Sequence, residues 1–409
     1  MKIFIGTSEI AGMLTFISNA YRELGHEVIT CSDNYGLGFY DNSYDIILNK
    51  EIFTAKSKNR YVNGVYRRVN DFWQSRLRER VFLQERDKHD VYIFMWNGFS
   101  QHSIDDYAYL RKKNKKIISL FLGSDVRHIS AFAQEYKLDV SEWEQWFHTM
   151  DLNSQLFRLR KAEMFSDAIF SVPDQAGLAV RPYNHIYIPF NASSIRQHIP
   201  DNTIPKIVHI PSRSGIKGTK FIIGALDRLR EEGLQFEFEL ISGVPNKVVL
   251  EKLQHADILV DEIFLHGPGT LSLEGIASGC AVATKTMPGG VYDDTAVCNI
   301  DFDNLYTKLR KLITDTEYRR GLIKRGRLVL EEVNSPLRVA DRILQKAIEV
   351  PTSGGQCCDH SPRFFSDAFT LPSNVTLSER NKELTRQVLR QYDLYDKLNI
   401  ERMRDNGLI

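Results

Sequence analysis

The chain has 409 residues, of which 43% are hydrophobic and 26% are charged, and its formal net charge is +1. This length is too great for one ordinary hydrophobic core and predicts two domains of ~150–200 residues each. The nearly balanced charge excludes a global attraction to nucleic acid or to membranes, so any such attraction must come from local patches.

The apolar runs are too short to cross a membrane, because none approaches the ~20 residues of a transmembrane helix. Glu9 and Gly12 interrupt the opening run before the core of a signal peptide could form. The five cysteines are scattered and odd in number, which is typical of free thiols in a large intracellular chain. We therefore expect a cytoplasmic protein.

The first half of the chain alternates short apolar runs with amphipathic helical patterns. Strands are predicted at 2–6, 27–31, 45–49, 91–96, 116–123 and 167–172, with helices such as 14–24 and 104–113 between them. Strands that alternate with helices of this length are typical of parallel βαβ units. Between 185 and 205 the periodicity is lost and proline and asparagine accumulate. We therefore place a first α/β domain at 1–195 and a linker at 196–205.

A second alternating series follows the linker. It predicts strands at 206–211, 236–242, 257–262 and 280–284, with helices at 218–232, 246–254 and 271–278 between them. Three further helical patterns, at 304–315, 317–333 and 335–350, close a second α/β domain over 206–350. The composition then changes, and 351–409 is predicted as an extension with a loop followed by a charged helix at 377–404.

The segment 206–290 carries the strongest chemical signal. Arg213 and Lys217 follow a predicted strand, which is where open α/β sheets bind ligands. A glycine-rich turn at 267–271 leads into a helix whose first turn contains Glu274. Cations and free backbone N–H groups suit a diphosphate, and a nearby carboxylate suits a ribose diol. The alternatives are a solvated basic loop and, for Glu274, a simple partner of the helix dipole.

The order of these motifs resembles a known family. The runs HIPSRSGIKGT, DILVDE and LEGIASGCAV are similar to the donor half of retaining glycosyltransferases of family four. The runs MKIFIGTSEIAGMLTFISNAYRELGHEV and LFLGSDVRH extend the resemblance to about residues 1–348. It implies the GT-B fold, an α/β architecture of two Rossmann-like domains whose parallel sheets face a cleft, with a C-terminal helical extension that often returns to the first domain.

The resemblance also implies an activity. Members transfer a sugar from a nucleoside diphosphate sugar to an acceptor hydroxyl with retention of configuration, in polysaccharide or glycoconjugate synthesis. The nucleotide sugar is a co-substrate, and neither a cofactor nor a metal is implied. Cys357, Cys358 and His360 lack the spacing of a structural zinc site, which agrees with that expectation.

Site residues follow from the resemblance. Arg213, Lys217 and His102 are expected at the reacting centre, the two cations on the leaving diphosphate and His102 near the donor sugar. At position 266 the family commonly has a glutamate, and here a histidine stands there, so either His266 or the nearby Asp261 or Glu262 takes its place. The residues expected to bind the donor are Gly12, Ser212, His266, Gly269, Thr270, Leu271 and Glu274.

The acceptor side has weaker signals. Asp125 and Arg127 follow a strand of the first domain and either line the acceptor pocket or form a structural ion pair. The segments 66–80 and 111–116 are basic, and the first also carries aromatic residues. These segments suit peripheral binding to an anionic membrane surface, or binding to an acidic polysaccharide or to nucleic acid. The alternative is that they are solvated helical faces without a partner. Of these, we favour a lipid-linked, glycan or small-molecule acceptor and no nucleic acid.

Two other classes of protein stay open. One is a different enzyme on the same fold, such as a nucleotide-sugar epimerase or a phosphorylase. The other is a non-catalytic subunit that stabilises a partner transferase, which the histidine at position 266 favours. The base, the sugar and the acceptor are not specified by these motifs.

Overall fold

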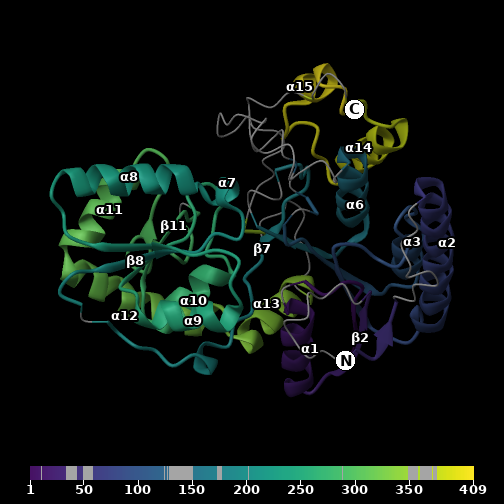
Figure 1. Cartoon of the computed structure of the whole chain (residues 1–409). Coiled ribbons are helices and arrows are strands. Elements are labelled where there is room, and N and C mark those ends of the chain that lie inside the picture. The colour runs from purple at the N-terminus through teal and green to yellow at the C-terminus, as the bar shows by residue number, and fades with distance from the viewer. Residues whose placement is uncertain are drawn as a thin grey trace. The chain divides into compact units, whose positions relative to one another are not determined.

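The computed structural model describes residues 1–10, 12–33, 44–48, 59–123, 125–126, 128, 151–172, 177–200, 202–287, 289–348, 358–359, 371 and 375–409. Its contacts divide the chain into two compact units (Figure 1). The first unit comprises Met1–Ile186 together with Ala340–Ile409, and the second comprises Tyr187–Val339. The C-terminal segment therefore belongs with the N-terminal half.

A seven-stranded parallel sheet forms the centre of the first unit. Its order is β3-β2-β1-β4-β5-β6-β7. In chain order the strands are β1 (Lys2–Gly6), β2 (Glu27–Ser32), β3 (Ile46–Ile47), β4 (Val91–Met95), β5 (Lys116–Leu120), β6 (Ala168–Ser171) and β7 (Asn184–His185). In register, Ile3 of β1 lies opposite Val28 of β2 and Val91 of β4. Every residue of β4 is buried, as expected for a parallel strand covered on both faces.

The order of these strands reverses at β1. The chain passes from β1 to β2 on one side and later returns to β4 on the other. In open α/β sheets, ligands bind at such a switch point, beyond the carboxyl ends of the strands. The helices of this unit are α1 (Met13–Glu23), α2 (Arg60–Glu85), α3 (Asp105–Lys112), α6 (Leu152–Phe165), α14 (Glu379–Gln391) and α15 (Ile400–Asp405), and most of α13 (Pro336–Ile348).

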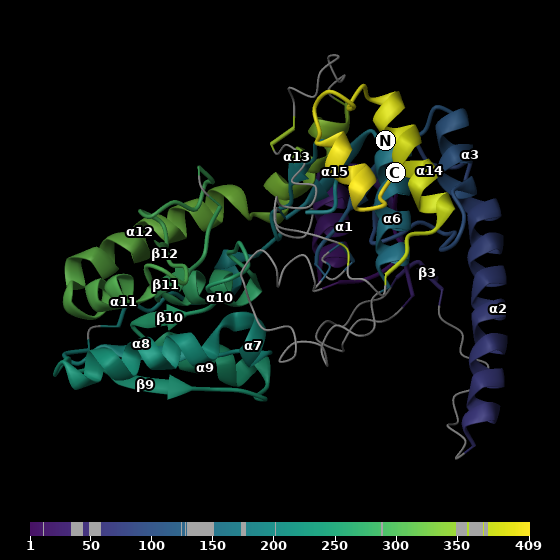
Figure 2. The ribbon, with the colours of Figure 1, turned by 90° about the horizontal axis from the view of Figure 1, so that it is seen from above.

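The C-terminal helix α14 packs against α6 (Figure 2). Val388 and Leu389 of α14 share a hydrophobic core with Leu156 and Leu159 of α6. Arg160 of α6 is buried and donates from Nε to Thr385 Oγ1 at 2.9 Å. The prediction of one helix over 377–404 is wrong in one respect. The segment forms two helices, because α14 ends at Gln391 and α15 begins at Ile400.

A five-stranded parallel sheet forms the centre of the second unit, in the order β12-β11-β10-β8-β9. Its strands are β8 (Lys206–His209), β9 (Glu237–Leu240), β10 (Ile258–Val260), β11 (Ala281–Thr284) and β12 (Cys298–Asn299). Its helices are α7 (Ser214–Lys217), α8 (Thr219–Glu231), α9 (Asn246–His255), α10 (Thr270–Ser278), α11 (Leu305–Thr314) and α12 (Thr316–Val333), with a short 3-10 helix at Ala192–Ser194. Here the strand order reverses between β8 and β10.

The predicted α/β class with parallel sheets is thus confirmed in both units. The four described cysteines, Cys31, Cys280, Cys298 and Cys358, are free thiols. No described helix combines the length and apolar character needed to cross a membrane.

Candidate functional site

Lys217 lies at the switch point of the second sheet. It ends α7, which follows β8, and its Nζ is 2.6 Å from Asp261 Oδ1 and 3.2 Å from Glu262 Oε2. Asp261 and Glu262 directly follow β10 and are buried. One ammonium group thus faces two carboxylates where the carboxyl ends of β8 and β10 meet.

The charge of Lys217 is stabilised by its neighbours. Burial acts to lower the pKa of this amine, but the charges of Asp261 and Glu262, and the hydrogen bonds to them, outweigh burial and raise the pKa above its ordinary value. Lys217 is therefore protonated at neutral pH. The ammonium group has three N–H donors; one donates to Asp261 Oδ1, and the group also forms an ion pair with Glu262.

Gly218 allows the close approach that makes this contact. It has φ 75°, in the left-handed region, and separates α7 from α8. A Cβ atom at this position would lie 2.5 Å from Ile263 Cγ1, so only glycine fits there.

The glycine-rich turn reaches the same place from another direction. Gly269 precedes α10, and a Cβ there would lie 3.6 Å from Glu262 Oε1. Ser272, in the first turn of α10, donates to Asp261 Oδ2 at 2.6 Å. No described side chain caps this helix, so the N–H groups of Thr270 and Leu271 are suitable for an anion.

Glu274 also lies near the start of α10. Its Oε1 accepts a hydrogen bond from Asn246 Nδ2 of α9 at 2.8 Å. Burial raises the pKa of Glu274, the hydrogen bond from Asn246 lowers it, and the charge of Asp261 raises it; the net shift is upward. The structure thus brings together Lys217, Gly269 and Glu274 around the turn at Asp261 and Glu262.

The other residues expected to bind the donor lie nearby in the chain. Ser212 and Arg213 are exposed in the loop between β8 and α7. His266 is half-buried, and the next residue, Gly267, donates from its backbone N to Lys285 O at 2.8 Å. Contacts of these three side chains with a donor stay a prediction.

Gly12 lies at the start of α1 in the first unit, with φ 78°. The carboxylate of Glu9, which the sequence analysis had not assigned a role, already accepts from the first turn of this helix. It lies 3.3 Å from Leu14 N, 3.2 Å from Thr15 N and 3.0 Å from Thr15 Oγ1. The negative charge of Glu9 therefore occupies the N-terminal end of α1, beside Gly12, and the role of Gly12 in donor binding stays a prediction.

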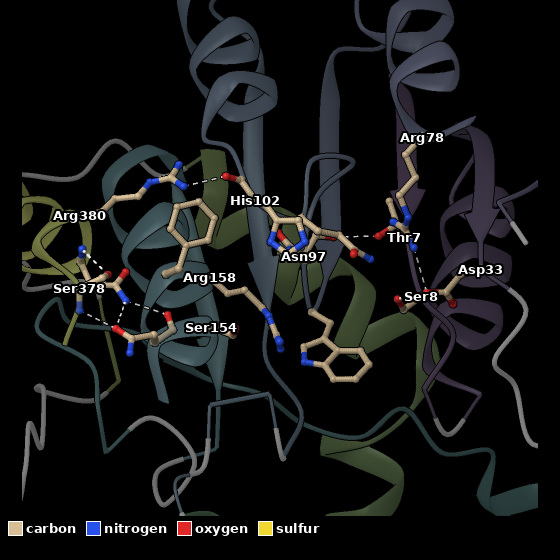
Figure 3. Close-up of a pocket in the computed structure, with 15 residues that line it drawn as sticks. Thr7, Ser8, Asp33, Arg78, Asn97, His102, Ser154, Arg158, Ser378 and Arg380 are labelled. Atoms are coloured by element: carbon tan, nitrogen blue, oxygen red, sulfur yellow. Dashed lines mark hydrogen bonds and ion pairs between the residues drawn. The ribbon is translucent and has the colours of Figure 1, made fainter. Parts of the chain in front are cut away.

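His102 lines a cavity of about 340 Å³ within the first unit (Figure 3). The cavity lies beyond the carboxyl ends of β1, β2 and β4, at the switch point of that sheet. Its lining residues come from seven separate parts of the chain: Thr7, Ser8, Asp33, Arg78, Trp96, Asn97, Gln101, His102, Asn153, Ser154, Phe157, Arg158, Ser378, Arg380 and Asn381.

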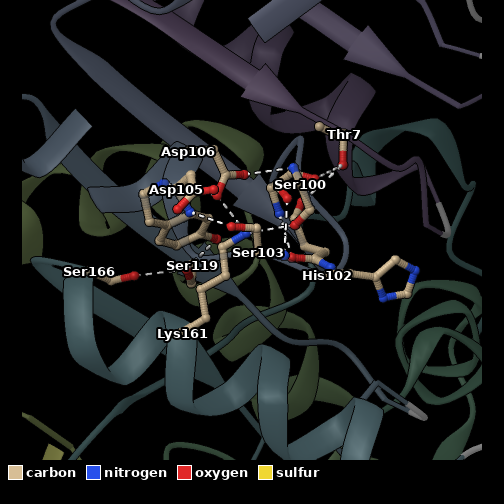
Figure 4. Close-up of polar contacts among 12 residues, drawn as sticks. Thr7, Ser100, His102, Ser103, Asp105, Asp106, Ser119, Lys161 and Ser166 are labelled. Carbon is tan, nitrogen blue, oxygen red and sulfur yellow. Dashed lines mark hydrogen bonds and ion pairs between the residues drawn. The ribbon is translucent and has the colours of Figure 1, made fainter. Parts of the chain in front are cut away.

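The loop that carries His102 is fixed by a buried ion pair (Figure 4). Lys161 Nζ of α6 lies 2.7 Å from Asp106 Oδ1 and donates to Ser100 O at 2.7 Å. Asp106 Oδ2 accepts from Ser100 N at 2.8 Å, and Arg380 donates to His102 O at 2.8 Å. The imidazole itself is exposed.

Asp125 is buried in a turn after β5. Its carboxylate accepts from Gly123 N at 2.7 Å and from Leu122 N at 3.1 Å. Burial raises its pKa, and the hydrogen bonds and the charge of Arg158 counteract this only in part. These contacts fix Asp125 within the turn, and its role in the acceptor pocket stays a prediction. Arg127, Cys357 and His360 lie outside the described residues.

Several residues of the cavity were not predicted from the sequence. Asp33 directly follows β2. Its place after a strand could have identified it as a candidate, because ligands bind beyond the carboxyl ends of such strands. Arg78, Arg158 and Arg380 lie on three different helices, and nothing in their local sequence distinguishes them from solvated arginines.

Comparisons with known proteins identify the fold. No protein-family model and no curated protein matches this chain. Among solved structures, sucrose-phosphate synthase from Thermosynechococcus elongatus is similar, with a TM-score of 0.54 and 13% identity over 84% of this chain and 97% of that one. A UDP-forming α,α-trehalose-phosphate synthase from Burkholderia xenovorans also aligns, with a TM-score of 0.49 and 11% identity over 86% of this chain and 99% of that one.

At such low identity a structural similarity shows the fold alone. The alignment with sucrose-phosphate synthase covers most of both chains. Together with the two parallel sheets it confirms the predicted GT-B fold class.

Proposed function

We propose that this protein transfers a glycosyl group from a nucleoside diphosphate sugar to an acceptor hydroxyl. The observation that carries the proposal is the convergence of Lys217, the N-terminus of α10 and Glu274 around the turn at Asp261 and Glu262. This arrangement lies at the switch point of a parallel sheet, where such folds bind ligands. The GT-B fold, which glycosyltransferases use, is consistent with it.

In this proposal the second unit binds the leaving diphosphate. As the glycosidic bond breaks, negative charge develops on the diphosphate, and fixed cations and N–H groups stabilise it. Arg213 and a further N–H donor of Lys217 supply cationic contacts, and Thr270 and Leu271 supply backbone N–H groups. Glu274 accepts from the ribose hydroxyls, with Ser212, His266 and Gly269 completing the donor site.

The finer chemistry follows the family resemblance. We propose retention of configuration, with the leaving phosphate accepting the acceptor's proton and His102 and Gly12 contributing from the first unit. Arg213, Lys217 and the backbone N–H groups of α10 would hold the diphosphate, no metal would be required, and the nucleotide sugar would be the co-substrate. The setting would be polysaccharide or glycoconjugate synthesis.

Calorimetry with UDP, ADP and GDP, followed by an assay of nucleotide-sugar hydrolysis, tests the proposal. Arg213→Gln is the decisive variant, because Arg213 is exposed and its replacement leaves the buried pair at Lys217 intact. Hydrogen bonds to charged groups are worth ~1.5–3 kcal/mol, so we expect the nucleotide to bind roughly 10- to 150-fold more weakly. Arg325→Gln, at an exposed position of α12, is the matched control.

The outcomes separate the classes of protein. Absence of binding for all three nucleotides would exclude the proposed donor site. Binding without hydrolysis or transfer would indicate a non-catalytic partner subunit. Conversion of the nucleotide sugar into an isomer would indicate an epimerase.

We further propose that α2 contacts an anionic membrane surface, on the cytoplasmic side. Tyr61, Val65, Phe72 and Leu83 are each more than half exposed and recur on one face of this 26-residue helix. Arg76 lies over the ring of Phe72 at 5.5 Å on the same face. Amphipathic helices with aromatic and basic residues lie in the membrane interface.

Co-sedimentation with vesicles tests this contact. We expect the wild type to bind phosphatidylserine vesicles and Phe72→Asp to lose at least ten-fold in binding. Leu328→Asp, at an exposed apolar position of α12, is the control for added charge. Equal binding to neutral and anionic vesicles, or no effect of Phe72→Asp, would reject the proposal.

A further inference from the structure

The cavity of the first unit contains polar atoms that lack partners. Within the described part of the chain, Asp33 Oδ1, Trp96 Nε1, Arg158 Nη1 and Asn381 Oδ1 are buried and make no hydrogen bond. Asp33 and Asn381 are only 7% and 3% exposed. Buried polar groups are normally hydrogen-bonded, so four such atoms around one cavity indicate a missing ligand.

Positive charge is compensated on the side of the cavity that carries Asp33 and Arg78, but not on the side that carries Arg158 and Arg380. Asp33 is already occupied by Arg78 at 3.2 Å and by Ser8 Oγ at 2.9 Å. Arg158 and Arg380 lie on the opposite wall and face no lining carboxylate of their own (Figure 3). The three arginines and one aspartate give the lining a net charge of +2 when His102 is neutral.

The two arginines are held in place by aromatic rings. Arg158 lies 5.3 Å from the ring centre of Trp96, and Arg380 lies 4.3 Å from that of Phe157. Both arginines line the cavity together with the rings that they contact. Planar guanidinium groups present paired N–H donors that match phosphate and carboxylate oxygens.

Arg158 is incompletely compensated in this position. Burial lowers the pKa of its guanidinium, and the nearby Asp125 and Asp151 raise it only in part. Asp125 is itself turned to the backbone N–H groups of Leu122 and Gly123. An anion in the cavity would supply the missing counter-charge.

Trp96 adds a second sign of a binding site. It has φ 68°, a left-handed conformation that bulky residues rarely adopt. Strained residues of this kind cluster at ligand sites. Here the conformation follows the end of β4 and places the indole in the cavity wall, where it offers a flat apolar face and an N–H donor.

The neutral lining residues suit a carbohydrate. Asn97, Gln101 and Asn153 bring side-chain amides, and Ser154 and Ser378 bring hydroxyls. Amides and hydroxyls both donate and accept, as sugar hydroxyls require.

We propose that this cavity binds the glycosyl acceptor and that the acceptor is a sugar carrying a phosphate or carboxylate group, which Arg158 and Arg380 recognise. The inference rests on the proposed transferase function, since that function requires an acceptor. The C-terminal segment completes the site. Ser378 N donates to Asn153 Oδ1 at 2.8 Å, and Asn381 Nδ2 donates to Asn153 O at 2.8 Å.

Binding of matched sugars to the full-length protein tests the inference. The probes are glucose, glucose 6-phosphate and glucuronate, measured by calorimetry at low and high salt. We expect at least one anionic sugar to bind ten-fold or more tightly than glucose, and high salt to reduce this ratio. Arg158→Gln and Arg380→Gln should each reduce the ratio to below three-fold.

Controls keep this test separate from that of the donor site. Arg404→Gln, at an exposed position of the same unit, should leave the ratio unchanged. UDP affinity should be unchanged in Arg158→Gln and Arg380→Gln, because the donor site lies in the second unit. A cooperative thermal unfolding transition of the first unit, with the midpoint of the wild type, checks that both variants are folded. Equal binding of glucose and both anionic sugars, or no binding of any probe while UDP binds, would overturn the inference and leave the transferase proposal standing. Absence of binding of UDP, ADP and GDP to the wild type would instead refute the proposed function.

Discussion

At the scale of single residues, Lys217 has two roles that a mutation removes together. It can contact the leaving diphosphate, and it compensates two buried carboxylates. Removing one partner of a buried ion pair leaves an uncompensated charge, which destabilises proteins by ~3–5 kcal/mol.

We therefore predict that Lys217→Ala lowers the free energy of unfolding by about 3–5 kcal/mol, in addition to reducing turnover. Urea denaturation of the purified variant measures the stability. Adding Asp261→Asn to Lys217→Ala removes one of the two unbalanced charges and should recover part of the loss. Identical stability of wild type and Lys217→Ala would contradict this account of the carboxylates.

Glu274 makes nucleotide binding sensitive to pH. Because the pKa of Glu274 is raised in the folded protein, folding favours its protonated form. Protonation of Glu274 in acid therefore does not reduce the stability of the fold. Ribose recognition, however, uses the carboxylate as an acceptor. We predict that nucleotide affinity falls on acidification, beginning at a higher pH than an ordinary glutamate would give.

Calorimetry between pH 5 and pH 8 measures this dependence. Glu274→Gln should bind more weakly at neutral pH and lose most of the decline, which separates this carboxylate from other titrating groups. If Glu274→Gln had the same pH profile as the wild type, the pH dependence of nucleotide binding would come from another titrating group.

At the scale of elements, the sequence predicts the longer strands well and the shortest ones poorly. β4 and β5 are mostly apolar and follow charged residues, and burial on both faces of a parallel sheet favours such apolar runs. β7 and β12 have two residues each and lie in no run predicted as a strand, whereas the equally short β3 lies in the apolar run predicted at 45–49. β7 and β12 are positioned by their neighbours in the sheet.

The proposed donor site and the cavity of the first unit also differ in how well they could be predicted from the sequence. Lys217, Gly269 and Glu274 lie in the segments that follow β8 and β10, two neighbouring strands of one parallel sheet, so their meeting could be predicted from the alternation of strands and helices. Arg158 and Arg380 lie on helices separated by more than half of the chain. Their meeting depends on the packing of α14 against α6, which local sequence does not specify.

The packing of α14 provides a test of its own. Leu389 is fully buried in the core shared with α6. Truncating a buried leucine to alanine costs ~2–5 kcal/mol, so Leu389→Ala should destabilise the first unit by about that amount. The neighbouring Arg390→Ala, whose side chain is 60% exposed, should change stability by no more than ~0.5 kcal/mol. Similar denaturation midpoints for both variants would mean that α14 does not contribute to the core.

At the scale of the whole molecule, each unit has its own sheet and core. A ligand that binds only one native unit stabilises that unit, by ~2.7 kcal/mol at a concentration 100-fold above its dissociation constant. We predict that UDP slows amide hydrogen exchange in β8, β10 and α10, and that an anionic sugar slows it in β4 and α6. Hydrogen-exchange mass spectrometry measures both, and UDP protection confined to the first unit would reverse our assignment of the donor.

The division of the first unit between the two ends of the chain has a consequence for biosynthesis. The ribosome finishes Met1–Ile186 roughly 200 residues before Leu389 emerges to close the core beside α6. At ~5–20 residues per second, this nascent portion waits about 10–40 s with its apolar surface uncovered, while the intervening unit is already complete. Newly made chains should therefore depend on chaperones during that interval. The second unit, which is synthesised later than Met1–Ile186, should complete its folding before the first unit does.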